Sequence, residues 1–273
     1  MVSSSDVQYL ERPGQGRLAF DVHGSGPLVL LVPGMGELRS TYRFLVPVLV
    51  DAGYTVATCD LRGHGESDAS FAGYGDVDTA GDVEALLREL GSPAVIVGNS
   101  MAAGAAVIVA AEHPELVRGL VLVGPFVRDP AAGFVKKLLF RVLMARPWAV
   151  AAWKAFLPTL YTGAKPADFA DYRAQVIASM KRPAHRRAFS ITTRTDHAAA
   201  ASSLARVTAP SLVVMGERDP DFPSPEAEAD WIARELRGTA AVIPDAGHYP
   251  HAQQPAHTAD VVIPFLAGLD SRA

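Results

Sequence analysis

The sequence predicts an α/β fold in which a mostly parallel sheet carries helices on both faces. Three observations lead to this prediction. Strand-like and helix-like segments alternate along residues 1–125, the alternation resumes after residue 206, and several strand-like segments are uninterrupted apolar runs. Alternating strands and helices form parallel sheets covered by helices, and strands buried on both faces lose the polar alternation of half-exposed ones.

The individual elements follow from local patterns. Residues 18–23 alternate apolar and polar side chains, whereas residues 28–32 are a continuous apolar run. A helix at about 41–51 ends near Gly53, and Pro47 either kinks it or resets its start. The other strands are predicted at 54–59, 94–97, 120–123, 211–215 and 239–243, and the other helices at 76–90, 101–111, 225–236 and 258–269. The helix at 76–90 is amphipathic, and its apolar side carries Val77, Ala80, Val83, Leu86, Leu87 and Leu90.

The middle of the chain has a different composition. Residues 126–205 show no clear strand and are predicted to form helices broken by prolines, at Pro130, Pro147, Pro158, Pro166 and Pro183. This segment holds ten of the 21 aromatic residues and thirteen lysines and arginines against four aspartates. We therefore expect an α/β body made of residues 1–125 and 206–273, with a helical cap inserted at 126–205.

Composition excludes several classes of protein. A net charge of −4 argues against general nucleic-acid binding, and a single cysteine, Cys59, excludes an internal disulfide framework. The first residues lack an apolar leader, and the longest run of small apolar residues, 101–111, is too short to span a bilayer. We expect a soluble cytoplasmic protein.

The most informative motif is the segment Gly98-Asn99-Ser100-Met101-Ala102, which follows a predicted strand and opens a predicted helix. A serine at the apex of such a turn needs a strained backbone, and small residues on both sides prevent a clash. Because a helix N-terminus favours a developing anion, we interpret Ser100 as a nucleophile. The alternative is an ordinary turn in a Rossmann-like fold.

A glycine-rich bend, Val32-Pro33-Gly34-Met35-Gly36, follows another buried strand. Such a bend can aim a backbone N–H group at a reacting carbonyl oxygen, and two donors of this kind form an oxyanion hole. We assign them to the backbone N–H groups of Met35 and Met101. A phosphate-binding loop is the alternative, but neither G-x-G-x-x-G nor a Walker lysine is present.

A catalytic base that changes protonation near neutral pH is supplied best by histidine. His248 follows the strand at 239–243 directly, in the segment Gly247-His248-Tyr249-Pro250. His251 and His257 are the competitors, but they lie beyond the strand-end loop, before the closing helix.

An orienting carboxylate should fix the tautomer of this histidine. Asp219, in the segment G-E-R-D-P-D after the strand at 211–215, is nearest the expected position, and Asp221 is the alternative. Glu217 is expected at the solvated rim. The segment D-L-R-G-H-G-E-S at 60–67 is interpreted as a structural loop that borders the pocket at most.

Taken in this order, the segments G-N-S-M-A, D-L-R-G-H-G-E-S, G-E-R-D-P and D-A-G-H-Y-P-H resemble the α/β-hydrolase superfamily over about residues 18–125 and 207–268. The resemblance implies the α/β-hydrolase fold, with an eight-stranded sheet and a cap, and a triad of Ser100, Asp219 and His248. It implies no cofactor and no metal. Many relatives have His-Gly ahead of the oxyanion donor where this chain has Pro33-Gly34, which leaves the substrate class open.

The predicted function is hydrolysis of a carboxylic ester, lactone or thioester of a mainly apolar small molecule through an acyl-enzyme. A C–C bond hydrolase, a perhydrolase and a slow-turnover ligand receptor with the same triad are the alternatives. Epoxide hydrolases and haloalkane dehalogenases of similar outline use aspartate at position 100, so those reactions are disfavoured. The predicted substrate-binding residues are Phe126, Trp148, Trp153 and Phe156.

The charge difference between cap and body predicts a further partner. A helix at 134–145 places Phe134, Leu138, Val142 and Ala145 on one face and Lys137 and Arg141 elsewhere. Such a basic helix can contact an anionic surface, an acidic carrier protein or an acidic substrate. The alternative is a basic cap that complements its own acidic body.

Overall fold

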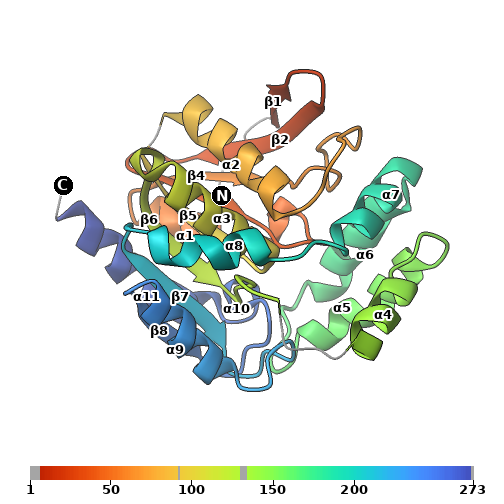
Figure 1. The fold of residues 1–273 in the computed structure, drawn as a ribbon. Helices are drawn as coiled ribbons and strands as arrows, with labels where there is room; N and C mark the ends of the chain where they lie inside the picture. The colour runs from red at the N-terminus through yellow and green to blue at the C-terminus, as the bar shows by residue number, and fades with distance from the viewer. Residues whose placement is uncertain (1–6, 92, 130–133, 272–273) are drawn as a thin grey trace.

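The computed structural model describes residues 7–91, 93–129 and 134–271. These residues build an eight-stranded sheet in the order β1-β2-β4-β3-β5-β6-β7-β8 (Figure 1). Strand β2 pairs antiparallel with β1 and with β4, and the remaining neighbours pair parallel. The predicted mostly parallel sheet is confirmed. The strands are β1 Gln8–Arg12, β2 Gly16–His23, β3 Leu28–Val32, β4 Thr55–Cys59, β5 Ala94–Asn99, β6 Val117–Val123, β7 Ser211–Gly216 and β8 Thr239–Ile243.

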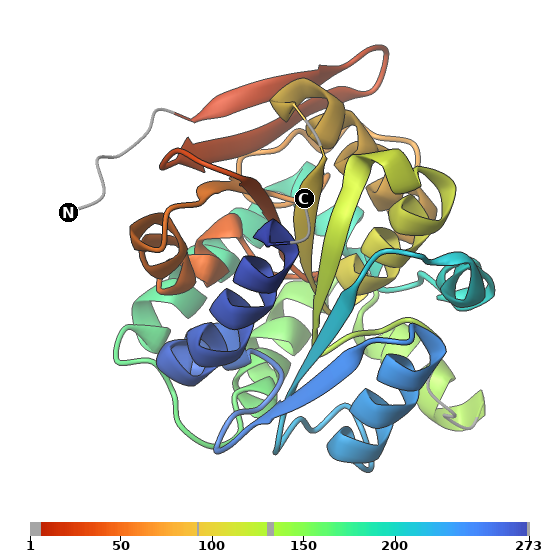
Figure 2. The ribbon, with the colours of Figure 1, turned by 90° about the vertical axis from the view of Figure 1, so that its left-hand side faces the viewer.

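Helices cover both faces of the sheet (Figure 2). The helices on the first face are α2 Asp76–Leu90, α3 Met101–Glu112 and α9 Pro225–Glu235, and those on the second are α1 Leu45–Asp51 and α11 Pro255–Asp270. Side chains of β3 alternate between the two faces. Leu30 and Val32 pack in the core beneath the helices of the first face, whereas Val29 and Leu31 pack in the core beneath those of the second.

Several local predictions need correction. The predicted helix at 41–51 is a 3-10 turn, η1 (Arg39–Tyr42), followed by α1, in which Pro47 lies in the first turn. The short elements η2 (Pro114–Leu116), η3 (Leu204–Arg206) and α10 (Pro250–Gln253) were not predicted. Strand β1 was not predicted from its residues either, because it is a half-exposed edge strand without an apolar run.

The buried face of α2 also differs from the predicted one. Val77 is 63% exposed, whereas Asp76 and Asp82 are buried. Asp82 is buried because Arg62 donates to its two carboxylate oxygens, from Nε and Nη2, at 2.6 Å each. The partner of Asp76 is His197, which belongs to the site described below. Apolar periodicity alone cannot reveal a buried face that depends on partners so distant in sequence.

The chain between β6 and β7 supplies the helices α4 Phe134–Leu143, α5 Ala149–Leu160, α6 Phe169–Lys181, α7 Pro183–Thr192 and α8 Ala198–Ser203. Helices α4 to α7, here called the insert, lie together beside the sheet (Figure 1), whereas α8 packs against α3. Pro158 lies in the last turn of α5 and does not end it, contrary to prediction. Pro130 lies outside the described residues.

The residues that the structure describes include no helix with both the length and the apolar character needed to cross a membrane.

Replacing Asp82 tests the buried ion pair that orients α2. Asp82→Asn removes the buried counter-charge of the Arg62 guanidinium and leaves only the exposed Asp78, 3.3 Å away, so we expect the free energy of unfolding to fall by about 3 kcal/mol. Glu84→Gln is the control, because its pair with Arg88 is partly exposed and we expect a change under about 0.5 kcal/mol. Chemical denaturation measures both, and equal effects of the two substitutions would contradict the prediction.

Candidate active site

Ser100 occupies a strained turn between β5 and α3. Its φ angle is 56° and its ψ angle −124°, a backbone conformation that residues other than glycine rarely adopt. Two glycines make room for the turn: a Cβ atom on Gly98 would lie 2.6 Å from the Ala102 carbonyl oxygen, and one on Gly34 would lie 2.8 Å from Ser100 Cβ. The turn therefore presents the hydroxyl at the start of α3, as the sequence predicts for a nucleophile.

His248 and Asp219 form a buried pair at the same edge of the sheet. His248 lies in the loop between β8 and α10, and Asp219 in the loop after β7. His248 Nδ1 lies 2.7 Å from Asp219 Oδ2, and both side chains are at most 2% exposed. Asp221 is farther away, with Oδ2 3.6 Å from the same nitrogen, and its backbone N–H donates to Asp219 Oδ1. Asp219 is thus the better placed of the two predicted carboxylates.

The charges around His248 favour its protonated form. Burial alone disfavours the imidazolium, but Asp219 and then Asp221 and Glu37 outweigh it and raise the pKa of His248 to about 9. Burial also raises the pKa of Asp221, and the negative charge of Asp219 adds to this effect. The site is therefore arranged to stabilise a positive charge on this imidazole, which is the charge that a general base acquires.

The other histidines and Glu217 have different environments. His251 is fully buried in α10, where its Nε2 lies 3.0 Å from Thr41 Oγ1, and burial lowers the pKa of His251 to about 3. His257 is exposed on α11. Glu217 is exposed and accepts a bond from the backbone N–H of Asp245, as expected of a rim residue.

His64 fixes the loop that carries the predicted oxyanion donor. Its Nε2 lies 3.0 Å from the backbone nitrogen of Gly36, and its Nδ1 lies 3.0 Å from the Arg62 carbonyl oxygen. Burial lowers the pKa of His64 to about 4, so the ring is neutral at pH 7. A neutral ring that donates from Nδ1 and accepts at Nε2 satisfies both bonds. The segment at 60–67 is interpreted from the sequence as structural. The structure adds that, through His64, this segment holds Gly36, the residue that follows Met35.

The insert holds this loop from the other side. The Trp153 indole N–H of α5 donates to the Gly36 carbonyl at 3.1 Å, and a Cβ atom on Gly36 would lie 2.5 Å from the indole ring. The Tyr172 hydroxyl of α6 donates to the buried carboxylate of Glu37. Burial raises the pKa of Glu37 to about 7, although Tyr172 and His248 oppose the shift.

A cavity of about 440 Å³ joins these groups. Its lining includes Ser100 and His248, together with Met35 and Met101, whose backbone N–H groups are the predicted oxyanion donors. Met101 is the first residue of α3, so its N–H group has no acceptor within the helix. Aromatic side chains form much of the remaining wall: Phe126, Phe140, Trp153, Phe156 and Tyr249.

Trp148 does not belong to this wall, contrary to the prediction. Its side chain is 48% exposed, and its indole N–H donates to the Val142 carbonyl at the end of α4. The other three predicted pocket residues, Phe126, Trp153 and Phe156, all line the cavity. The bond accounts for the difference, because it ties the Trp148 ring to the carboxyl end of the preceding helix, α4.

A metal ion at the triad is the other arrangement to consider. Asp219, Asp221 and His248 each offer one ligand atom, and these atoms lie within 4.8 Å of one another. However, two ligands each 2.0–2.2 Å from a tetrahedral ion are about 3.3 Å apart. The 2.7 Å between His248 Nδ1 and Asp219 Oδ2 is shorter and fits a direct hydrogen bond.

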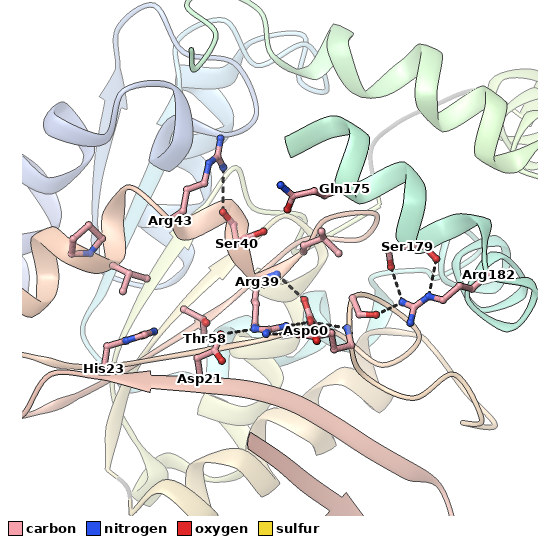
Figure 3. Close-up of a pocket in the computed structure, with 15 residues that line it drawn as sticks. Asp21, His23, Arg39, Ser40, Arg43, Thr58, Asp60, Gln175, Ser179 and Arg182 are labelled. Carbon is pink, nitrogen blue, oxygen red and sulfur yellow. Dashed lines mark hydrogen bonds and ion pairs between the residues drawn. The ribbon is translucent and has the colours of Figure 1, made fainter. Parts of the chain in front are cut away.

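A second cavity, of about 620 Å³, lies between α6 and the body, and Ser100 is not among the described residues that line it (Figure 3). Two of its arginines connect the two ends of α6 to the body. Arg43 donates to Asp168 through two bonds of 2.6 and 2.5 Å, and Arg182 donates to the Gly65 carbonyl. These contacts tie α6 to the body and thereby hold Tyr172 against Glu37.

Comparison with known proteins agrees with this geometry. The model of the alpha/beta hydrolase family matches residues 29–261. The chain belongs to this family, and it is a hydrolase.

Three similar proteins illustrate the likeness. The chain is 30% identical to 2-(acetamidomethylene)succinate hydrolase of Mesorhizobium japonicum, over 96% of this chain and 97% of the relative. It is 29% identical to the pimeloyl-[acyl-carrier protein] methyl ester esterase of Neisseria meningitidis, over 88% and 94%. The solved structure of a thermophilic esterase from Thermogutta terrifontis superposes with a TM-score of 0.80 at 24% identity, over 97% of this chain and 99% of that one. The last comparison shows the fold alone.

Titration of His248 tests the electrostatics of the site. We expect NMR to give a pKa of about 9 for this imidazole, and Asp219→Asn to lower this pKa, because the main charge that opposes the effect of burial is then removed. Asp221→Asn should lower the pKa less, because its carboxylate is farther away. A larger effect of Asp221→Asn than of Asp219→Asn would contradict the assignment.

Proposed function

We propose that the protein is a serine hydrolase that cleaves a carboxylic ester, or a lactone or thioester, of a mainly apolar small molecule. The observation that carries the proposal is the cavity in which a strained Ser100 faces the same space as a histidine paired with a buried aspartate. The aromatic wall supports an apolar substrate, because such surfaces bind ligands by removing apolar area from water. The esterase name of the Neisseria relative supports ester chemistry.

The mechanism begins with proton transfer. In its neutral form, His248 accepts the hydroxyl proton of Ser100 as Oγ bonds to the substrate carbonyl carbon, and the carbonyl oxygen becomes an anion. Asp219 stabilises the resulting imidazolium. The backbone N–H groups of Met35 and Met101 donate to the oxyanion.

The second half regenerates the enzyme. The tetrahedral intermediate collapses, the bond to the leaving oxygen breaks, and His248 gives its proton to that oxygen. A water molecule then loses a proton to His248 and attacks the acyl-enzyme. Release of the carboxylic acid returns the proton to Ser100.

Removal of the nucleophile is the direct test of this function. Ser100→Ala should lower the turnover of p-nitrophenyl esters at least ~10³-fold, because no covalent intermediate can form. A fluorophosphonate probe should label the wild-type protein at Ser100 and leave the folded variant unlabelled. A near-normal ester rate in the folded variant would refute the proposal. Lactones belong in the same screen because they are cyclic esters. β-Diketones belong there because C–C bond hydrolysis uses the same triad.

His64 is proposed as a positioning residue for the oxyanion hole. His64→Leu removes the acceptor of the Gly36 N–H group, so the neighbouring Met35 donor loses its fixed direction. We expect kcat to fall at least ~10-fold, toward the ~3 kcal/mol that loss of one oxyanion donor costs, with KM little changed.

The control for this substitution is His113→Leu, at a partly exposed histidine after α3. Thermal melting of both variants separates loss of positioning from loss of folding. If His64→Leu instead raised KM by a similar factor and left kcat unchanged, His64 would affect substrate binding and not the oxyanion hole.

A further inference from the structure

A second buried pair of aspartate and histidine lies beside the same cavity, and its histidine lines the cavity wall. Asp76 is the first residue of α2 and His197 precedes α8, and His197 Nδ1 lies 2.7 Å from Asp76 Oδ2. Both residues are at most 8% exposed. The mechanism proposed above uses neither of them.

The surroundings hold the imidazole of His197 in a fixed orientation. The backbone N–H of His197 donates to Asp129 Oδ1 at 3.0 Å. The Thr195 hydroxyl accepts a bond from the backbone N–H of Asp76 at 3.2 Å, and it lies 3.5 Å from Asp76 Oδ1. Asp129 therefore fixes the backbone of His197, and Thr195 fixes the Asp76 carboxylate that the imidazole contacts.

The ring lies on the cavity wall, close to the catalytic histidine. His197 and His248 both line the cavity that contains Ser100. The Phe126 ring stands near each of them, with its centroid 5.6 Å from that of His197 and 5.8 Å from that of His248. A substrate bound at Ser100 and packed against Phe126 would thus reach His197.

The bonds of this histidine determine what it can recognise. Because the Asp76 carboxylate occupies Nδ1, Nε2 is the ring nitrogen left to form a hydrogen bond with a substrate. The nearby charges do not favour an anionic group over a neutral one, because Arg141 and Arg194 share the cavity wall with Asp129 and Asp196. The complementary substrate group is therefore a neutral polar one, such as a hydroxyl or an amide.

A purely structural histidine looks different in this protein. His251 is completely buried, bonds to Thr41 through Nε2, and is not among the described residues that line the cavity. In His197 the nitrogen used for bonding is Nδ1, and no described residue is a partner of Nε2. Nε2 therefore belongs to a ring that lines the cavity containing Ser100.

We propose that His197 is a specificity-determining residue whose Nε2 forms a hydrogen bond with a hydroxyl or amide group of the substrate, several atoms from the scissile carbonyl. This inference rests on the proposed function, because it concerns the substrate of Ser100. It narrows the substrate class to esters that carry such a polar group and are otherwise apolar. Asp76 acts through His197, by fixing its tautomer and direction.

A series of paired esters tests the proposal. The probes are p-nitrophenyl esters of straight-chain acids, each compared with analogues that carry one hydroxyl or acetamido group at successive carbons. We expect the wild-type kcat/KM to be about 5- to 10-fold higher for one substituted ester than for its unsubstituted partner, as for one net hydrogen bond. In His197→Phe this ratio should fall to about one, whatever the absolute rates.

Two further variants separate recognition from structure. His197→Gln keeps a hydrogen-bonding amide and should retain part of the ratio, whereas His257→Gln, at an exposed histidine of α11, should leave the ratio unchanged. Thermal melting confirms that each variant folds. A wild-type enzyme without preference for any substituted ester, or an unchanged ratio in folded His197→Phe, would overturn the proposal.

The proposed function fails by a different result. If the fluorophosphonate probe does not label Ser100 in the wild-type protein, the assignment of the nucleophile is wrong. If labelling occurs at Ser100 and the ester ratio does not depend on His197, only the inference about His197 is wrong.

Discussion

The positive φ angle of Ser100 is the constraint on which the geometry of the site depends. The neighbouring strand holds the turn, because the Ser100 N–H donates to the Val123 carbonyl at 2.9 Å, and the Phe126 N–H donates to the Ser100 carbonyl at 3.2 Å. Strain of this kind costs about 1–3 kcal/mol and persists only when the surroundings fix it. Gly34 and Gly98 supply the space, so the chain approaches the serine from two sides without a clash.

The loop next to this turn is held by side chains of both the body and the insert. The loop at 34–38 passes beside Ser100, and three side chains from distant parts of the chain bond to it, namely His64, Trp153 and Tyr172. Two of the three belong to the insert. The insert is therefore more than a wall of the cavity, because its contacts also fix the direction of the loop that carries a proposed oxyanion donor.

The sequence was most informative where chemistry depends on short segments. Ser100 follows β5 directly, and Asp219 and His248 lie in the loops after β7 and β8. Parallel strands bring such positions to one edge of the sheet, so it was predictable that the three residues would lie near one another. Contacts between distant residues were not predictable. Examples are the pairing of Asp76 with His197, the bond between His64 and the Gly36 backbone, and the bond that orients Trp148. Each forms only in the folded chain. The proposed contact of the basic insert with an anionic partner stays a prediction.

The most direct test of the account is a crystal structure of the protein after reaction with a fluorophosphonate. The account predicts phosphorus bonded to Ser100 Oγ, and a phosphoryl oxygen within hydrogen-bond distance of the backbone nitrogens of Met35 and Met101. His248 should lie beside the bonded oxygen and keep its contact with Asp219. An adduct on another residue, or a phosphoryl oxygen directed away from both nitrogens, would contradict the account.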